Sequence, residues 1–394
     1  MNLLFVANRI PYPPYRGDKL KIYNLSKRLC RKHTLHLLTF IQSEDELEHL
    51  VPLREIFTHI EVIYLPKTQS IINAIAYFFT GMPLQVLYFR SRRFQKMLNE
   101  YLKVNKPDAI HVQHLRMAQY LENHKEQKRI LDLPDAFSLY WQRRKTVKRS
   151  LISRIVDSIE SKRVIRYEKV LHKFNMSLVC SAEDLDFLKE KHEADNIRLL
   201  PNGVDLDTFY PRNHDYSHNH RILFTGNMDY APNIDAVQYF VKDILPFVKK
   251  QFPETEFIIA GQRPVAKVLE LKGEDVEITG FVKDLAEMYD TASIVVAPLR
   301  FGAGTQNKVL EAMAMGIPVV CSHVGFKGLG IQSGEGAIMQ TEAEGFAQSV
   351  IDLLRDEGYR KTVGEKGAEV IRNNFGWDAI SERLEGYFEE VAKG

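Results

Sequence analysis

The chain has 394 residues, of which 45% are hydrophobic and 26% charged. This composition excludes a disordered or fibrous protein, and the length allows two domains, each with its own core. The net charge of +2 conceals an asymmetry: residues 1–200 carry 34 Lys and Arg against 22 Asp and Glu (net +12), and the remainder carries 19 against 29 (net −10). The basic first half indicates an anionic partner, and a chance distribution of charge over a large surface is the less favoured alternative.

The three cysteines, Cys30, Cys180 and Cys321, are far apart and form no Cys-x-x-Cys pair. We therefore expect reduced thiols in a cytoplasmic protein, with neither a disulfide nor a metal-binding role. Met1 leads directly into an apolar run, so no secretory signal peptide is expected.

The N-terminal residues predict a strand, a loop and a helix. Residues 2–7 are apolar and precede a loop with three prolines that ends at Gly17. Apolar residues at helical spacing then predict a helix over residues 19–31. In an α/β domain this arrangement places the loop at the carboxyl end of the strand, where such sheets bind ligands. A purely structural turn is the alternative.

Two segments of the first half raise the question of a membrane surface. Residues 71–89 are apolar and aromatic, but Gly81 and Pro83 interrupt them, so they are too broken to span a bilayer. Core packing is the favoured interpretation, and docking to a membrane surface is the alternative.

Residues 143–173 carry 11 basic and three acidic side chains at helical apolar spacing. The pattern fits a helix on anionic lipid and a solvated helix over the core equally well. It contains no aromatic-interleaved basic platform, so nucleic acid is not an expected partner. The basic residues are densest at the start of this segment: Arg143, Arg144, Lys145, Lys148 and Arg149.

Residues 107–114 predict a further strand with His114 at its end, and residues 129–135 predict another that leads to Asp135. His111 and His114 are not expected to form a metal pair, because residues three apart on a strand point to opposite faces. A structural role for His114 is the alternative to a functional one.

Residues 293–322 predict a strand, a glycine loop, a helix and a second strand. Gly302 and Gly304 allow the backbone to approach a ligand closely, and Thr305 is the expected N-cap of the helix. Lys308 and Glu311 share one helical face. Free amides, a lysine and a carboxylate are what a nucleotide diphosphate with a ribose requires. An ordinary βαβ unit with a surface Lys–Glu pair is the alternative.

The run from Lys308 through Glu311 to Pro318 resembles the donor-binding motif of family-4 retaining glycosyltransferases, and residues 306–315 most resemble its exosortase-associated branch. The resemblance covers nearly the whole chain. It implies the GT-B fold, two Rossmann-like α/β domains with parallel sheets facing across a cleft. The expected domains are residues 1–200 on the acceptor side and 201–375 on the donor side, with a helix at 376–394 that crosses back.

The resemblance also implies roles for individual residues. Glu311 would bind the donor ribose, Lys308 the diphosphate and His114 the reacting sugar, and these three are the expected catalytic residues. The expected donor-binding residues are Gly17, Gly226, Asn227, Phe281, Gly302, Gly304, Thr305, Gln306, Asn307, Lys308 and Glu311. The expected acceptor-side residues are Arg16, Asp18, Lys19 and Asp135.

The sequence departs from the family pattern at two points. Ala303 stands where relatives carry a glutamate that faces the donor sugar, and the Arg and Lys that usually follow the turn at Gly226 are absent. These departures leave open a subunit that binds a nucleotide sugar without catalysis. A nucleotide-sugar 2-epimerase of the same architecture is a second alternative.

The main expectation is transfer of a sugar, with retention, from a nucleotide-diphosphate donor to a glycan or lipid-linked acceptor of a cell-surface polysaccharide. The leaving diphosphate would take the acceptor proton in a front-face displacement. The enzyme would lie in the cytoplasm or peripherally on the inner membrane face. No metal or other cofactor is expected, because the two Asp-x-Asp pairs lie at the hinge and on a helix.

Overall fold

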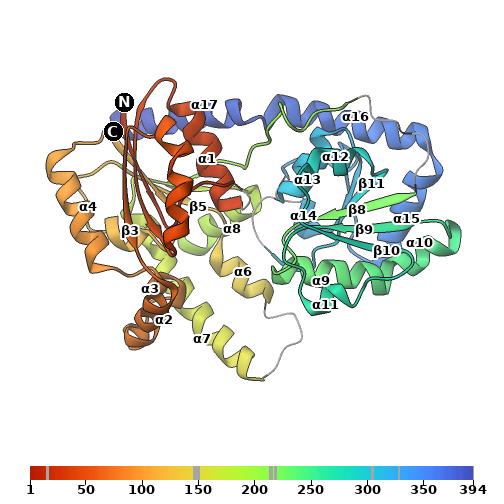
Figure 1. The fold of residues 1–394 in the computed structure, drawn as a ribbon, viewed down its shortest axis with the longest axis horizontal. Coiled ribbons are helices and arrows are strands. Elements are labelled where there is room, and N and C mark those ends of the chain that lie inside the picture. The colour runs from red at the N-terminus through yellow and green to blue at the C-terminus, as the bar shows by residue number, and fades with distance from the viewer. Residues whose placement is uncertain are drawn as a thin grey trace. The chain divides into compact units, whose positions relative to one another are not determined.

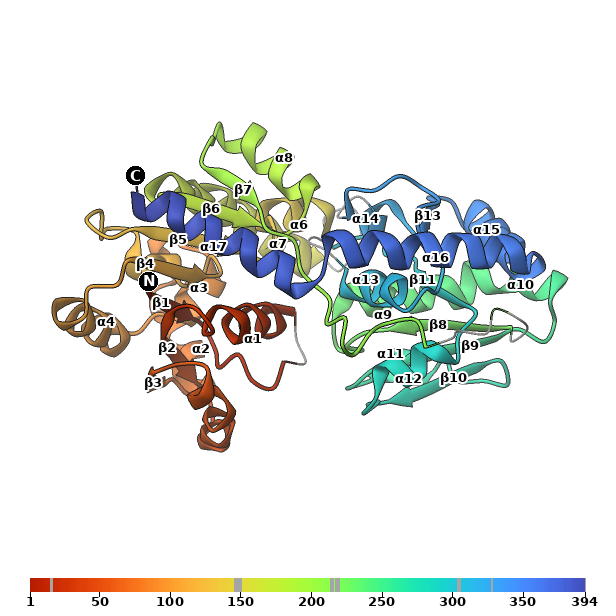
Figure 2. The same ribbon diagram turned by 90° about the horizontal axis from the view of Figure 1, so that it is seen from above.

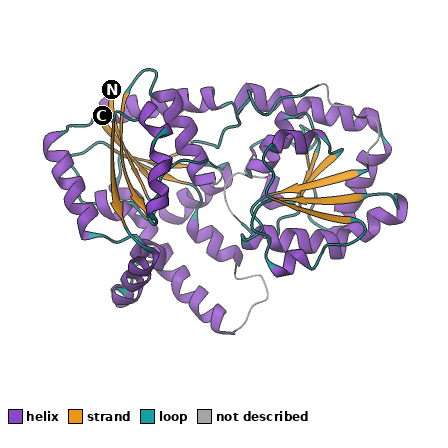
Figure 3. Ribbon diagram, viewed as in Figure 1, coloured by secondary structure: helices purple, strands orange, loops and turns teal. Residues whose placement is uncertain are grey.

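The computed structural model describes residues 1–14, 17–144, 151–212, 216, 220–302, 306–326 and 329–393 (Figure 1). The chain divides into two compact units. Unit 1 comprises Met1–Pro201 and Asp378–Gly394, and unit 2 comprises Asn202–Trp377. Each unit contains its own parallel sheet with helices on both faces (Figure 3).

Unit 1 is built on a seven-stranded sheet in the order β3-β2-β1-β4-β5-β6-β7. The order reverses between β1 and β4, and ligands of open α/β sheets bind at the carboxyl ends of strands beside such a reversal. The strands are β1 (Asn2–Ala7), β2 (Thr34–Ile41), β3 (His59–Tyr64), β4 (Ala109–Gln113), β5 (Arg129–Leu133), β6 (Met176–Val179) and β7 (Ile197–Leu199). The helices before β6 are α1 (Gly17–Leu29), α2 (Lys67–Ala76), α3 (Leu84–Tyr88), α4 (Arg92–Val104), α5 (Ala118–Leu121), α6 (Phe137–Arg144) and α7 (Leu151–Glu168); α8 (Ala182–His192) and most of α17 (Trp377–Lys393) complete the unit.

The core of unit 1 explains why its strands are mainly apolar. The five strands from β1 to β6 that lie inside the sheet are buried on both faces, as in other parallel sheets, and side chains such as Phe5, Phe40 and Leu131 are fully buried. The C-terminal helix α17 packs against the same unit (Figure 2): Phe388 contacts Phe5, and the Tyr387 hydroxyl donates to Leu199 O at 3.0 Å. The last segment of the chain therefore belongs to the first unit.

Unit 2 is built on a six-stranded sheet in the order β10-β9-β8-β11-β12-β13, which reverses between β8 and β11. Buried aliphatic runs such as Ile294–Ala297 form its strands. The strands are β8 (Arg221–Thr225), β9 (Glu256–Ala260), β10 (Val276–Gly280), β11 (Ile294–Ala297), β12 (Val319–Cys321) and β13 (Ala337–Met339). The helices are α9 (Ala231–Tyr239), α10 (Leu245–Gln251), α11 (Ala266–Leu269), α12 (Leu285–Asp290), α13 (Asn307–Ala314), α14 (His323–Phe326), α15 (Ala343–Arg355) and α16 (Glu357–Asn374).

The structure corrects two expectations about the first half of the chain. Helix α1 begins at Gly17 and ends at Leu29, two residues earlier at both ends than expected. The apolar segment 71–89 splits into α2, a short 3₁₀ turn η3 (Phe78–Thr80) and α3. Val86, Leu87 and Phe89 join the core, but α2 and η3 do not, because four of their large apolar side chains are exposed: Ile71, Ile72, Ile75 and Phe79. Core packing was therefore the wrong expectation for α2. No helix in the described residues is long and apolar enough to cross a bilayer.

Candidate functional site

Helix α13 places Lys308 beneath the carboxyl end of β8. The helix begins at Asn307, with Gln306 rather than Thr305 in the N-cap position. Lys308 is 7% exposed, and its Nζ donates to Asn233 Oδ1 at 2.8 Å and lies 4.5 Å above the ring of Phe224. The lysine is thus held at the sheet reversal by a neutral amide and an aromatic face.

The surroundings of Lys308 stabilise its charged form only weakly. Burial lowers the pKa of Lys308 to about 7, and Glu311 opposes that shift. A buried ammonium without a carboxylate in contact is costly, so an anion bound beside it would restore its charge. The group is therefore suited to a phosphate ligand.

Glu311 is oriented by Tyr289, a buried residue of α12. The Tyr289 hydroxyl donates to Glu311 Oε2 at 3.0 Å and lies 2.8 Å from Thr225 Oγ1. Burial raises the pKa of Glu311, whereas Tyr289 and Lys308 lower it. Within the described part of the chain, Glu311 Oε1 has no hydrogen-bond partner, and Glu311 is half-exposed. Tyr289 therefore fixes Oε2 of Glu311, and Oε1 can accept a hydrogen bond from a ligand hydroxyl.

The backbone turn after β8 is packed too closely for side chains. Gly226 has a φ of 152°, and an added Cβ would lie 2.6 Å from Asn233 Nδ2. That amide donates to Asn227 O at 3.0 Å, while Asn227 Oδ1 accepts from Gln262 Nε2 at 2.9 Å. Asn233 therefore connects three expected site residues: it packs on Gly226, bonds Asn227 and holds Lys308.

Two arginines lie in loops at the carboxyl end of the unit 2 sheet. Arg300, between β11 and α13, forms a two-point ion pair with Asp235 of α9, with Nε–Oδ2 and Nη2–Oδ1 distances of 2.8 and 2.5 Å. Arg263, after β9, adopts a φ of 59° and lies 3.4 Å from Asp229. Both arginines pair with an acidic residue of the turn after β8 or of the helix that follows it.

The other expected donor-binding residues have mixed positions. Asn307 adjoins Lys308, and its Oδ1 accepts from Asn202 Nδ2 at 2.9 Å. Gly302 precedes the helix with a φ of 144°. Phe281 is 58% exposed after the edge strand β10, three strands away from β11, so the sheet order does not bring it to Lys308. Gly304 and Thr305, like Ala303, lie outside the described residues.

In unit 1, His114 follows β4 in a strained conformation. Its φ is 76°, which is unfavourable for a residue with a Cβ. Its Nδ1 accepts from the Arg116 amide at 3.3 Å, so the ring proton of the neutral imidazole resides on Nε2. Burial, aided by Arg116 and Arg9, places the pKa of His114 well below its usual value. The side chain is a neutral hydrogen-bond donor.

Asp132, at the end of β5, belongs to the core. Its carboxylate accepts from Lys21 Nζ at 2.7 Å and from His111 Nε2 at 3.1 Å, and both carboxylate partners are buried. Burial alone would raise the pKa of Asp132, but Lys21 and His111 outweigh it and keep the pKa low. Asp132 is therefore a structural residue rather than one that contacts an acceptor.

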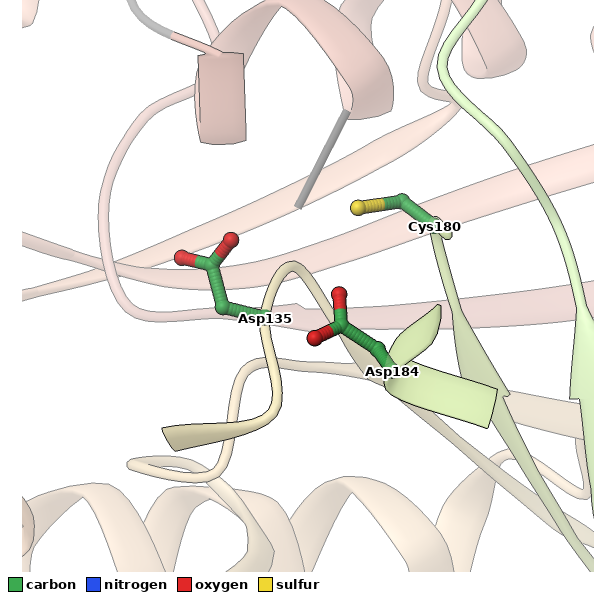
Figure 4. A group of neighbouring side chains, drawn as sticks. All are labelled: Asp135, Cys180 and Asp184. Carbon is green, nitrogen blue, oxygen red and sulfur yellow. The ribbon is translucent and has the colours of Figure 1, made fainter. Parts of the chain in front are cut away.

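Asp135 lies in a group with Cys180 and Asp184 (Figure 4), whose donor atoms are within 4.8 Å of one another. The thiol donates to Pro134 O at 2.7 Å, and the Ser181 hydroxyl donates to Asp184 at 2.7 Å. Burial, together with Asp184 and Asp18, raises the pKa of Asp135 to about 7. Burial also raises the pKa of Asp184, to about 6. The proximity of Asp184 disfavours the ionised form of Asp135, so Asp135 is protonated more readily than an exposed aspartate.

The expected donor-binding residue Gly17 and the remaining acceptor-side residues lie at the start of α1. Gly17 is its first residue, Asp18 lies 3.8 Å from Arg9, and Lys19 Nζ donates to Tyr12 O at 3.3 Å. Asp18 is close enough to Asp135 to affect its pKa, so these two residues share one site with Asp184. Arg16 lies outside the described residues.

Comparison with known proteins agrees with this geometry. Residues 219–356 match the family model of "Glycosyl transferases group 1". This stretch is similar to a group 1 glycosyltransferase domain. Across 95% of the chain and 96% of the relative, the protein is 23% identical to an "Uncharacterized 44.6 kDa protein in cps region" of Klebsiella pneumoniae. The matched stretch contains the donor-side residues described above, apart from Asn202 and Gly17.

Solved structures show that the fold is GT-B. Sucrose-phosphate synthase from Thermosynechococcus elongatus has a TM-score of 0.74 at 18% identity and covers 99% of each chain. Anabaena Alr3699/HepE, in complex with UDP and glucose, has a TM-score of 0.70 at 14% identity and also covers 99% of each chain. At such identities the likeness is one of fold.

The sequence did not single out several groups that the structure places in the two sites. In unit 2 these are Asn233 and Tyr289, and in unit 1 they are Arg116 and Asp184. Asn233 had a signal, since an amide seven residues after Gly226 lies near the start of the next helix. Tyr289 had none, because its link to Glu311 spans 22 residues and depends on how α12 packs against α13.

Proposed function

We propose that the protein is a retaining glycosyltransferase that moves a sugar from a nucleotide-diphosphate donor to a glycan or lipid-linked acceptor of a cell-surface polysaccharide. The observation that carries this proposal is the Lys308–Glu311 pair, whose members are oriented by Asn233 and Tyr289 at the sheet reversal. A structural neighbour of the same fold binds UDP and glucose, and a relative belongs to a cps region. Both support a nucleotide-sugar substrate and a polysaccharide product.

In this proposal, Lys308 binds the donor diphosphate and Glu311 accepts hydrogen bonds from the ribose. The amides at the start of α13 and the turn at Gly226 add further donors. Arg263 or Arg300 supplies the positive charge that relatives draw from the position after that turn. His114 donates its Nε2 proton to a hydroxyl of the reacting sugar, which agrees with its neutral state.

The proposed reaction is front-face displacement. The bond from the anomeric carbon to the diphosphate breaks, the acceptor oxygen bonds to the same face, and the departing phosphate takes the acceptor proton. Lys308 and the backbone amides stabilise the charge that develops on the leaving group. We propose that these groups suffice without a metal and that the enzyme acts in the cytoplasm. Within the family, residues 306–315 favour the exosortase-associated branch.

The test is thermal stabilisation of the purified protein by UDP, GDP, ADP and their sugars. One nucleotide should raise the melting temperature, and Glu311→Ala should abolish that rise, because a charge-assisted hydrogen bond is worth about tenfold or more in affinity. Tyr289→Phe should weaken it partially. Glu344→Ala, an exposed glutamate of α15, is the matched control.

Transfer is then tested with the stabilising nucleotide sugar. Formation of a glycosylated product with retained configuration supports the proposal. Binding with neither transfer nor hydrolysis would favour the non-catalytic subunit that the Ala303 departure leaves open. An equal thermal shift in Glu311→Ala and the unaltered protein would refute the donor-site assignment.

A further inference from the structure

Helix α2 has its apolar face toward solvent. Ile71, Ile72 and Ile75 are 53%, 56% and 69% exposed, and Phe79 in the following turn is 94% exposed. Their spacing places all four on one side of the segment. Two polar residues of α2 face inward, whereas Lys67, Thr68 and Gln69 of its first turn are exposed. Ser70 is fully buried, and Asn73 Nδ2 donates to Arg90 O at 2.8 Å. From Ser70 onward the isoleucines face solvent and these polar side chains face the protein, which is the inverse of a helix that covers a core.

This arrangement is fixed by α7. The Leu84 amide donates to Glu160 Oε1 at 2.6 Å, and Arg163 Nη2 donates to Phe78 O at 2.9 Å with its guanidinium 4.1 Å above the Phe78 ring. Figure 1 shows α2, α3 and α7 together at one end of unit 1. Helix α7 adds two exposed apolar side chains, Val156 and Ile159, at 47% and 42%. We call these six residues the apolar surface: Ile71, Ile72, Ile75, Phe79, Val156 and Ile159.

The charges around the apolar surface have one sign. Along α7, the carboxylates of Asp157, Glu160 and Glu168 are all buried, at 5%, 4% and 0% exposure. Residues 62–99 contain no Asp or Glu at all but five Lys and Arg. The exposed charged residues of α2 and α7 are therefore all basic within the described part of the chain: Lys67, Arg154, Lys162, Arg166.

One occupant fits this combination. A second copy of the chain would bring the same cations together across a two-fold axis, which is unfavourable. An anionic lipid surface instead attracts the basic residues and accepts the apolar side chains at the boundary between headgroups and acyl chains. We propose that unit 1 docks on an anionic phospholipid bilayer through the apolar surface, with Phe79 inserted and Lys162 and Arg166 at the headgroups.

This inference goes beyond the proposed function, because it concerns where the protein is held rather than what it transfers. It also locates the contact differently from the basic segment 143–149. Arg143 forms an ion pair with Glu183, and Lys145, Lys148 and Arg149 lie outside the described residues. The inverted helix α2 carries the apolar contribution.

The test is co-sedimentation of the full chain with vesicles of phosphatidylcholine, with and without phosphatidylglycerol. Ile75→Ser with Phe79→Ser should reduce binding to the anionic vesicles about tenfold or more, because two exposed apolar side chains no longer enter the bilayer. Lys162→Gln with Arg166→Gln should reduce it by roughly fivefold for each charge and should weaken its dependence on salt. Val104→Ser, which alters an 82% exposed valine at the end of α4, is the matched control and should bind as the unaltered protein does.

Each variant is also assayed for thermal stabilisation by nucleotide, which should be unchanged because none of these residues lies in the donor site. Intact nucleotide binding with lost vesicle binding supports the docking surface. Vesicle binding that is unaffected by the Ile75 and Phe79 substitutions would overturn it. So would loss of a dimer in gel filtration, without a change in vesicle binding, because a second copy would then cover the surface.

Discussion

Each of the two candidate sites holds ionisable groups, a lysine in unit 2 and two aspartates in unit 1, whose charged forms are disfavoured by burial. In unit 2, burial lowers the pKa of Lys308 to about 7, and its contacts are the amide of Asn233 and the ring of Phe224. In unit 1, burial and neighbouring carboxylates raise the pKa of Asp135 to about 7 and that of Asp184 to about 6. The unit 2 site therefore favours an anionic ligand, and the unit 1 site favours a cation or a hydrogen-bond donor. Both sets of groups are oriented before their ligands arrive, which reduces reorganisation on binding.

A third group, formed by Lys21, Asp132 and His111 in unit 1, holds a buried carboxylate whose hydrogen-bonding and ionic partners are all present. Lys21 and Asp132 are in contact at 2.7 Å, His111 completes the carboxylate, and the pKa of Asp132 stays low. We infer from this difference which residues are structural: the paired charges of Lys21, His111 and Asp132 hold the sheet together, whereas Lys308 and Asp135 have no partner of opposite charge in contact among the described residues.

The largest effect on stability should come from removing one member of the Lys21–Asp132–His111 group. Lys21→Met leaves Asp132 buried without its cation, which should destabilise unit 1 by about 3–5 kcal/mol. The melting temperature measured by circular dichroism reports the loss. Lys27→Met, at an exposed position of the same helix, should change the melting temperature little. A change in melting temperature as small as that of the control would contradict the structural role of the Lys21–Asp132 pair.

The next effect sharpens the description of Lys308. If only the charged lysine binds diphosphate, the affinity for a nucleotide-diphosphate sugar should fall about tenfold between roughly pH 6 and pH 8, because the pKa of free Lys308 lies near 7. Binding should also take up a proton. Titration calorimetry in buffers of different ionisation enthalpy measures both quantities. The diphosphate of such a donor is fully ionised throughout this range, so its own titration does not interfere.

Lys308→Arg provides the internal control for that experiment. A guanidinium stays charged throughout, so the pH dependence should flatten even if the affinity changes. A flat profile in the unaltered protein would mean that Lys308 is already charged before the ligand binds.

The smallest effect concerns the stability of unit 1. A carboxyl whose pKa is raised in the folded state binds more protons than in the unfolded state between about pH 4 and 7, so its contribution to stability is present at the acidic end and lost as the pH rises. Asp135→Asn removes the repulsion with Asp184 and should raise the melting temperature by about 2–4 °C near pH 8, with less change near pH 5. Asp186→Asn, exposed on α8, is the control. An equal shift at both pH values would argue against a raised pKa of Asp135.

Local patterns predicted much of this molecule. The buried strands, the loop before α13 and the spacing of Lys308 and Glu311 depend on residues that are neighbours in sequence, so periodicity and turn chemistry indicate them. GT-B architecture followed from the resemblance and is confirmed by the solved structures. The position of each side chain in its site stays a prediction.

Contacts across long sequence separations were not predictable in this way. Asn233 reaches Lys308 over 75 residues, and Asp184 reaches Asp135 only after β5 and β6 pair. The prediction that α2 packs in the core was wrong for a related reason. Its apolar periodicity fits an inward and an outward apolar face equally well. The hydrogen bonds from Glu160 and Arg163 of α7, which hold the neighbouring turn and α3, favour the outward orientation. Composition alone contains no information about that choice.

The left-handed backbone at His114 has a consequence for variants of this protein. Any residue with a Cβ is strained at a φ of 76°, whereas glycine adopts this conformation freely. Replacement by glycine therefore relieves a conformational penalty while removing the imidazole. The chain thus has a conformationally strained histidine at position 114, where glycine would adopt the same backbone without strain. Because the imidazole is buried against the ring of Phe137, its removal also leaves a cavity, and the cost of that cavity opposes the relief of backbone strain.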